Sequence, residues 1–245
     1  MKTTQIPADK SRWGSFDELR ENTDKVSLNL LHELLKSKHA KGSSEQKIAD
    51  LYNAYTNFNV RNKVGLAPLQ SYFKKIDDIK NLDDLQNYLL EVTPIGENPF
   101  YGVYVYADLK NSHQNTVYMG DVNLGLGKTY YQKEDAKNTE TLEKYAQFID
   151  QLMPFTGKKI INHTGSKIVT FEKMISQYIK TVEEDRDPNK SYNPVKLSEI
   201  KKLTKNIDFE KYVTSLGINP EIVVIGELDY YKNLDKILNL SLIHI

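Results

Sequence analysis

The chain has 245 residues, of which 39% are hydrophobic and 27% are charged, with 33 basic and 33 acidic side chains. A formal net charge of zero gives little attraction for phosphates, so no nucleic-acid partner is expected. No apolar run approaches the roughly 18 residues that a membrane-spanning helix needs, and the polar start of the chain does not read as a signal peptide. The absence of cysteine excludes disulfides and thiolate metal sites.

Apolar residues recur with helical spacing through the first part of the chain. Ser15 and Glu18 form a capping box, in which each side chain satisfies a free backbone amide, and this predicts a helix start at Ser15. Glycine and serine at 41–44 end that helix, and Pro94 with Gly96 ends the last of the series. The four expected helices cover residues 16–35, 48–58, 69–79 and 82–92.

Strand-like alternation replaces the helical period from residue 100 onward. An aromatic and β-branched run at 100–108, a polar turn at 111–114 and a returning run at 116–119 predict one β-hairpin. An acidic, proline-marked connection occupies 185–194. Helices are expected at 142–152, 168–182, 197–203 and 209–216, and a brief strand at 222–225. The predicted fold class is therefore mainly α, with one small β-hairpin.

Two short motifs approach known signatures but each lacks a required residue. His32 begins the pattern H-E-x-x-H of zinc proteases, but Lys36 stands where the second histidine is needed, and an ammonium repels a metal dication. The run G-L-G-K-T at 125–129 resembles a phosphate-binding loop, but Val122 replaces its first glycine and Tyr130 the third glycine of a dinucleotide fingerprint. We expect a surface histidine and a tight loop. The residues predict no metal site and no catalytic group.

Five short blocks follow one another along the chain, at residues 6–20, 61–69, 108–112, 125–131 and 186–193. They read I-P-A-D-K-S-R-W-G-S-F-D-E-L-R, R-N-K-V-G-L-A-P-L, D-L-K-N-S, G-L-G-K-T-Y-Y and R-D-P-N-K-S-Y-N. In this order the blocks resemble the N-terminal region of the neprilysin-like zinc endopeptidases, including the bacterial endopeptidase O-like members. Lys128 and a shortened spacing depart from the family pattern in the fourth block.

The resemblance implies a fold and assigns different functions to two lobes. Members of this family are two-lobed zinc metalloendopeptidases that cleave small peptides inside a cavity between the lobes. Their zinc ligands and general base lie in a C-terminal catalytic lobe, on an H-E-x-x-H helix and a later E-x-x-x-D helix, and this chain contains neither motif. Residues 1–239 are then expected to be the N-terminal, cavity-forming helical domain, which gates the substrate. Zinc would belong to the full-length member, and this chain would bind none and be inactive alone.

The resemblance also assigns two arginines to substrate binding. Arg12 matches the family arginine that pairs with the carboxylate end of bound peptide, and Arg20 matches a second arginine nearby. A guanidinium suits this task because its planar fork can hold both carboxylate oxygens. The alternative for Arg12 is an ion pair with Asp9 or Asp17 that fixes the turn.

Three further expectations concern the parent protein. Met1 resembles an internal methionine, and residues 240–245 resemble a translated sequencing adapter, hence a non-native tail. The full-length parent is expected to be periplasmic or secreted, with a cytoplasmic location left open, and the lack of cysteine favours a bacterial source. The alternative function is a stand-alone helical domain that binds peptides without catalysis.

Overall fold

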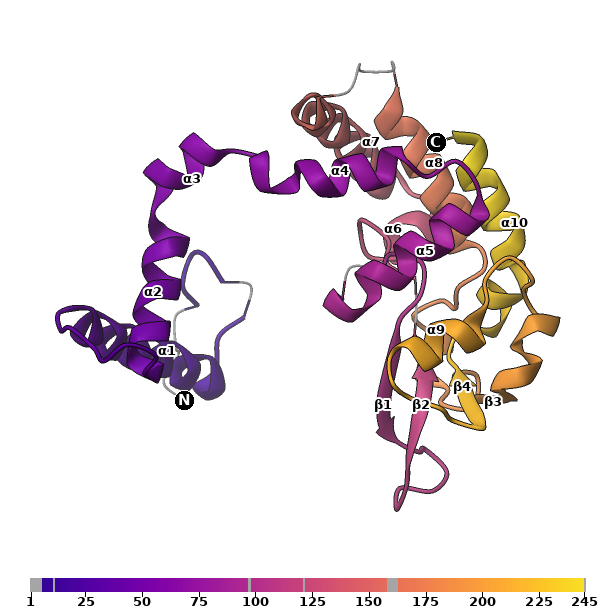
Figure 1. The fold of residues 1–245 in the computed structure, drawn as a ribbon, viewed down its shortest axis with the longest axis horizontal. Coiled ribbons are helices and arrows are strands. Elements are labelled where there is room, and N and C mark those ends of the chain that lie inside the picture. Colours follow the sequence, from indigo (N-terminus) through magenta and orange to yellow (C-terminus); the bar gives the residue numbers. More distant parts are fainter. Residues whose placement is uncertain (1–5, 11, 97, 121, 158–162, 245) are drawn as a thin grey trace. The chain divides into compact units, whose positions relative to one another are not determined.

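The fold was analysed in a computed structural model, which describes residues 6–10, 12–96, 98–120, 122–157 and 163–244, with backbone only beyond residue 240. The chain forms two compact units, Met1–Pro68 and Leu69–Ile245, which are called unit 1 and unit 2 below. Helices dominate both units, and the strands lie in unit 2 (Figure 1).

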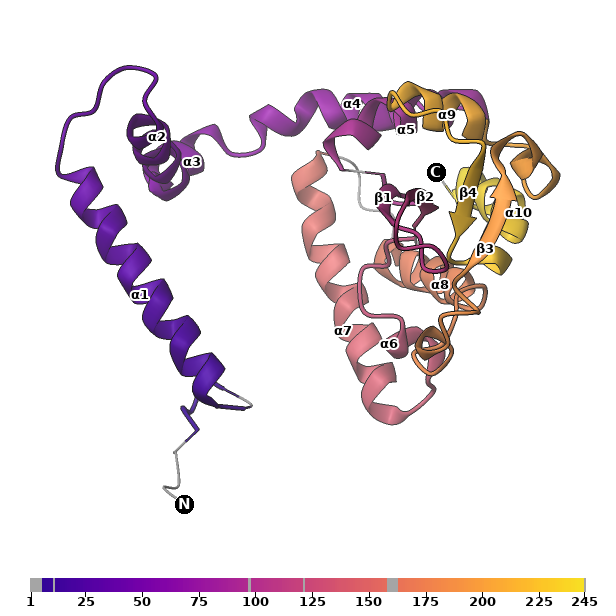
Figure 2. The same cartoon turned by 90° about the horizontal axis from the view of Figure 1, so that it is seen from below.

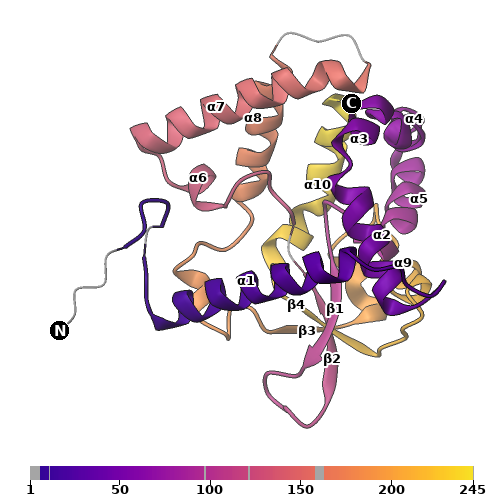
Figure 3. The ribbon, with the colours of Figure 1, turned by 90° about the vertical axis from the view of Figure 1, so that its left-hand side faces the viewer.

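Unit 1 is built from three helices: α1 (Ser15–Leu35), α2 (Ser44–Thr56) and α3 (Phe58–Val64). Figures 2 and 3 show α1 as one long helix that a loop joins to α2. Ser43 caps α2 by accepting a hydrogen bond from the Gln46 amide, at 3.2 Å. The helix start at Ser15 is confirmed, but the capping box is wrong, because Gly14 is the N-cap residue and no side chain caps α1. None of the described residues of these three helices is buried.

Unit 2 contains the other helices, most of which the sequence predicts. Helix α8 ends before the expected limit of 182, and α6 and α10 were not expected as helices. Their bounds are α4 (Gln70–Asp77), α5 (Leu82–Val92), α6 (Thr129–Gln132), α7 (Ala136–Leu152), α8 (Thr164–Ser176), α9 (Phe209–Ser215) and α10 (Leu228–His244). Short 3₁₀ helices occur at η1 (Ala67–Leu69), η2 (Thr93–Ile95), η3 (Met153–Thr156), η4 (Glu184–Arg186) and η5 (Leu197–Lys202).

The strands form one four-stranded sheet in the order β1-β2-β4-β3 (Figure 1). Their bounds are β1 (Val103–Ala107), β2 (Asn115–Met119), β3 (Asn193–Lys196) and β4 (Ile222–Ile225). Strands β1 and β2 are the expected antiparallel hairpin, and β4 is the expected brief strand. Strand β4 runs parallel to β2, and β3 pairs antiparallel with β4. The hairpin is therefore half of a larger sheet. The sequence did not reveal β3 because Pro194 reads as a turn residue, although an edge strand tolerates proline.

The core of unit 2 lies between the sheet and the helices α5, α9 and α10. Five side chains of α10 are fully buried: Tyr230, Tyr231, Leu234, Ile237 and Leu238. The Tyr230 hydroxyl donates to the Phe100 carbonyl at 2.7 Å, and the Tyr231 hydroxyl donates to the Gly120 carbonyl at 3.0 Å. These bonds attach α10 to the open end of the hairpin, just before β1 and just after β2. Each bond also satisfies a buried hydroxyl, which requires a partner.

Helices α7 and α8 lie side by side (Figures 1 and 3) and approach closely at Gly165. A Cβ atom on Gly165 would lie 1.9 Å from the Ala146 carbonyl oxygen. The Gly165 amide also donates to the Asp150 carboxylate at 2.8 Å. Backbone cannot yield as a flexible side chain can, so this contact requires glycine.

We predict that Gly165→Ala lowers the free energy of unfolding by about 1–3 kcal/mol, because the added methyl group forces α7 and α8 apart. Chemical denaturation followed by circular dichroism measures the change. Gly102→Ala is the matched control, since nothing lies within 4 Å of its added Cβ. Equal stability of the two variants would contradict the close approach.

Candidate functional site

The two arginines predicted to bind substrate lie in unit 1, and both are exposed. Arg12 precedes α1, and Arg20 lies within its first turns. No ion pair of Arg12 with Asp9 or Asp17 is formed among the described residues, and Asp9 instead faces the Lys10 ammonium at 3.6 Å. Ser11 of the same block lies outside the described residues. Substrate binding by these arginines stays a prediction.

The H-E-x-x-K run lies on α1 and contacts α2. The ring of His32 packs edge-to-face on Tyr52 of α2, with centroids 6.3 Å apart. Lys36 pairs with Glu33 at 3.3 Å. The described part of the chain holds no group of three or more His, Cys, Asp or Glu side chains that could hold a metal ion.

The glycine loop of the fourth block binds a carboxylate of its own chain. The Gly125 amide donates to Glu172 Oε1 of α8 at 2.8 Å, and the Leu126 amide donates to the Tyr131 hydroxyl at 3.0 Å. Tyr131 in turn donates to Glu172 Oε2 at 2.8 Å. Burial, together with the facing carboxylate, raises the pKa of Tyr131 and keeps its hydroxyl protonated. The Gly125 and Leu126 amides are thus occupied by groups of the same chain, as expected for a tight structural loop.

Glycine at position 125 leaves room for another tyrosine. A Cβ atom there would lie 1.7 Å from the hydroxyl of Tyr145, on α7. Burial and the Glu172 carboxylate also raise the pKa of Tyr145. The glycine loop, α7 and α8 therefore meet around the Glu172 carboxylate. No motif or spacing in the sequence predicts this role for Glu172.

Two other blocks meet at Asp108, which follows β1. Asp108 Oδ1 accepts from the amides of Lys110 and Asn111 at 2.8 and 3.0 Å. Tyr192 of the last block donates its hydroxyl to Oδ2 at 2.9 Å. Burial opposes the charged form, but these donors outweigh it, so the pKa of Asp108 is lowered. The D-x-K-N-S turn and the R-D-P block are thereby joined.

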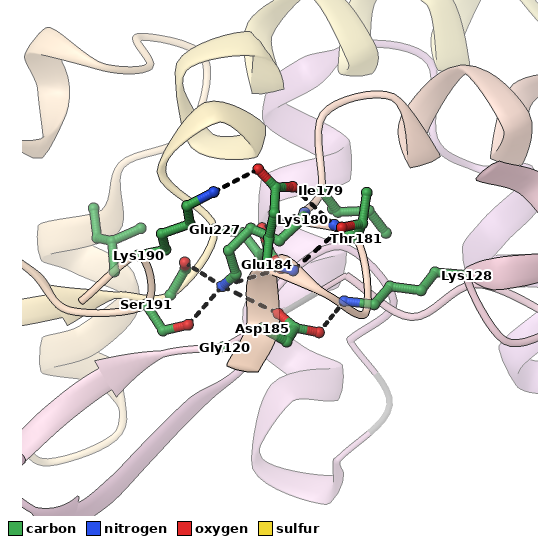
Figure 4. A network of polar contacts seen from close by, with 12 residues as sticks. Gly120, Lys128, Ile179, Lys180, Thr181, Glu184, Asp185, Lys190, Ser191 and Glu227 are labelled. Carbon is green, nitrogen blue, oxygen red and sulfur yellow. Dashed lines mark hydrogen bonds and ion pairs between the residues drawn. The ribbon is translucent and has the colours of Figure 1, made fainter. Parts of the chain in front are cut away.

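A polar network around Lys180 joins the segment after α8 to the end of β4 (Figure 4). The Lys180 ammonium donates to the Ser191 hydroxyl at 2.9 Å and to the Gly226 carbonyl at 2.8 Å. It also faces Glu227 Oε1 at 3.4 Å and Asp185 Oδ1 at 3.5 Å. The Glu227 side chain is only 3% exposed and that of Lys180 14%. This is a buried ion pair in which both partners have further hydrogen bonds.

The network extends to the surface through Asp185 and Glu184. Asp185 pairs with Lys128 of the glycine loop, and Glu184 pairs with Lys190 at 2.9 Å (Figure 4). Cavities of about 380 and 300 Å³ lie against the network, and Ile179 and Glu227 line both of them. Because oxygens of the chain itself already surround the Lys180 ammonium, the network is better suited to holding the segment after α8 against β4 than to binding a ligand.

Comparison with known proteins places these blocks in one family. The family model described as peptidase family M13 matches residues 1–244. The chain belongs to peptidase family M13. It covers the N-terminal domain of these zinc metallopeptidases, which confirms the resemblance to the neprilysin-like enzymes. The mainly helical fold class is likewise confirmed, with the small sheet described above.

Relatives of this M13 chain are peptidases. Endothelin-converting enzyme 1 of Cavia porcellus is 25% identical, over 98% of this chain and 33% of the relative. Neutral endopeptidase of Lactococcus lactis subsp. cremoris is 21% identical, over 98% of this chain and 39% of the relative. The crystal structure of the Mycobacterium tuberculosis zinc metalloprotease ZMP1 with an inhibitor superposes with a TM-score of 0.85 at 24% identity, over 99% of this chain and 38% of that one. The chain thus spans little more than a third of these proteins.

We predict that Lys180→Met lowers the free energy of unfolding of the M13 chain by about 3–5 kcal/mol, because it removes the ammonium that faces the buried Glu227 carboxylate. Lys128→Met is the control: its partner Asp185 is 41% exposed, so a loss of about 0–1 kcal/mol is expected. Urea unfolding measures both. Similar losses in the two variants would show that the buried Lys180–Glu227 pair contributes no more to the free energy of unfolding than the exposed pair.

Proposed function

We propose that the chain is the N-terminal, substrate-gating part of a zinc metalloendopeptidase that cleaves small peptides. The match to peptidase family M13 over residues 1–244 carries this proposal. The relatives are two and a half to three times as long as the matched part, as the 33% and 39% coverage implies. The zinc ligands and general base would come from a C-terminal catalytic lobe, and the helices of this chain would wall the cavity and exclude folded proteins.

Arg12 would hold the C-terminal carboxylate of the peptide, with Arg20 nearby as a second cation. Both side chains are exposed, and Asp9, the nearest acid in sequence, pairs with Lys10 instead. A guanidinium keeps its charge at all relevant pH values and can form two parallel hydrogen bonds to a carboxylate. The observation in favour is therefore a pair of arginines that unit 1 leaves open to a ligand.

The catalytic lobe would be the partner that covers the apolar stripes of unit 1. Large apolar side chains on its helices are strongly exposed, at 86% for Phe16, 72% for Leu51 and 65% for Leu30. Exposed apolar patches of this kind mark interfaces, because leaving them in water is unfavourable.

The location of the parent remains part of the proposal. No helix in the described part of the chain is both long and apolar enough to cross a bilayer. We propose that the parent is periplasmic or secreted, with a cytoplasmic location as the alternative.

We predict that Arg12→Ala in the full-length peptidase raises KM by about 10–100-fold for peptides with a free C-terminal carboxylate, because a charge-assisted hydrogen bond contributes about 1.5–3 kcal/mol. Carboxamide peptides of the same sequence should be affected less than twofold, and Arg12→Lys should lie between. Steady-state kinetics on the matched peptide pairs measure the effect.

Lys25→Ala, a substitution on α1, the helix that follows Arg12, serves as the control for a lost surface cation. A loss that is equal for free and amidated peptides would contradict carboxylate recognition. The coding sequence downstream should also contain H-E-x-x-H in the same frame; its absence would favour peptide binding without catalysis.

We predict that the purified chain self-associates through the stripes of unit 1. Phe16→Ser combined with Leu51→Ser should shift the sedimentation profile towards monomer, because these substitutions remove apolar area at two exposed sites. Tyr106→Ser, on an exposed strand of unit 2, is the control. A monodisperse monomer at high concentration of the unaltered chain would contradict the need for a covering partner.

A further inference from the structure

The two edges of the sheet in unit 2 are protected differently. Strand β3 carries Pro194, which cannot donate to a further strand, and Lys196, whose charge discourages pairing. The Asn193 side chain also turns back to the Lys190 and Ile225 carbonyls. Strand β1 reads V-Y-V-Y-A and has no charge, proline or glycine. One edge is thus closed to strand addition, and the other is open.

The hydrogen-bond register shows which groups of β1 face outward. Gly102 accepts from Gly120 at 2.8 Å, and Asp108 donates to Gln114 at 2.9 Å, so even-numbered residues bond to β2. In an antiparallel ladder, residues whose amide and carbonyl bond to the partner strand alternate with residues whose amide and carbonyl point away from it. Val103 and Val105 therefore turn their amides and carbonyls away from β2, and no described residue bonds to them.

The side chains of β1 offer apolar surface on both faces of this edge. Tyr104, Val105 and Tyr106 are 54%, 53% and 65% exposed. The Tyr104 ring stacks on that of Tyr118 in β2, with centroids 5.2 Å apart and planes 8° from parallel, which holds it over the sheet. Tyrosine on one face and valine on the other can contact alternate side chains of an added strand.

We propose that the open edge of β1 binds an extended, uncharged peptide segment of about five residues by strand addition, as a binding site additional to Arg12. The proposal rests on the proposed function, since a peptidase presents its cavity to extended peptides. The length of the edge decides the occupant. Five residues extend about 17 Å, far too little to bury the roughly 1,200–2,000 Å² of a stable interface between two copies.

Backbone N-methylation of the peptide tests the proposal on the unaltered chain. The probe is an acetylated and amidated heptapeptide that alternates valine and threonine and carries a fluorophore on one lysine. Amides of an added strand point alternately towards β1 and away from it. N-methylation of one alternate set should weaken binding at least tenfold in fluorescence anisotropy, and methylation of the other set should change it less than twofold.

Equal effects of the two methylated sets, or no saturable binding, would overturn the proposal. Because the probe has no terminal carboxylate, Arg12→Ala should leave its affinity unchanged. Absence of probe binding at β1 is therefore distinguishable from absence of carboxylate recognition by Arg12 in the full-length peptidase. Sedimentation with and without the probe should show no dimer formed through β1; a dimer that the probe dissociates would instead identify a second copy as the occupant.

Variants of Val105 give an independent test. Val105→Pro removes one outward amide without touching the bonds to β2, and it should weaken probe binding at least tenfold. Val105→Thr keeps the amide and the side-chain shape, so its affinity should stay within twofold. Circular dichroism verifies that both variants fold. Retained binding by a folded Val105→Pro variant would exclude backbone pairing at this edge.

Discussion

The parallel pairing of β2 with β4 is the contact on which unit 2 depends. It joins Val117 to Val223, residues that lie far apart in sequence, so the chain between them must close a long loop before the contact forms. Burial repays this entropy, because Val223, Val224 and Ile225 are almost fully inaccessible. Helix α10 follows directly and is held to the hairpin through the tyrosine hydroxyls. The Lys180 network then fixes the segment after α8 to the same end of β4 (Figure 4).

Local patterns predicted local structure well. The hairpin follows from strict alternation beside a polar turn, and α5, α7 and α9 follow from single apolar stripes. Helix α10 was not expected, although its buried side chains at positions 230, 231, 234, 237 and 238 form one apolar stripe. Residues 240–244, part of the expected tail, continue this helix. The tail itself and the internal status of Met1 stay predictions, since residue 245, the last side chains and residue 1 lie outside the described residues. The capping box at Ser15 failed because Gly14 takes the extended cap position.

The polar contacts show where reasoning from sequence stops. Glu172 and Gly125 are separated by 47 residues, as are Lys180 and Glu227, and no periodicity connects such pairs. The family blocks nevertheless marked the right places: the D-x-K-N-S turn and the last block meet at Asp108, and the glycine loop closes on α8. These blocks shape and hold the domain. Arg12 and Arg20, which we propose bind substrate, are exposed and make no comparable contacts among the described residues.

The central proposal is that this chain would form part of a peptide chamber and would rely on another part of the peptidase for metal and catalysis. Zinc titration of the purified 245-residue chain, read by calorimetry with a peptide-cleavage assay on the same sample, tests it most directly. We predict no tight stoichiometric zinc uptake and no hydrolysis, because the described residues provide no cluster of three metal-binding side chains. Uptake of one zinc ion per chain together with peptide cleavage would contradict the claim.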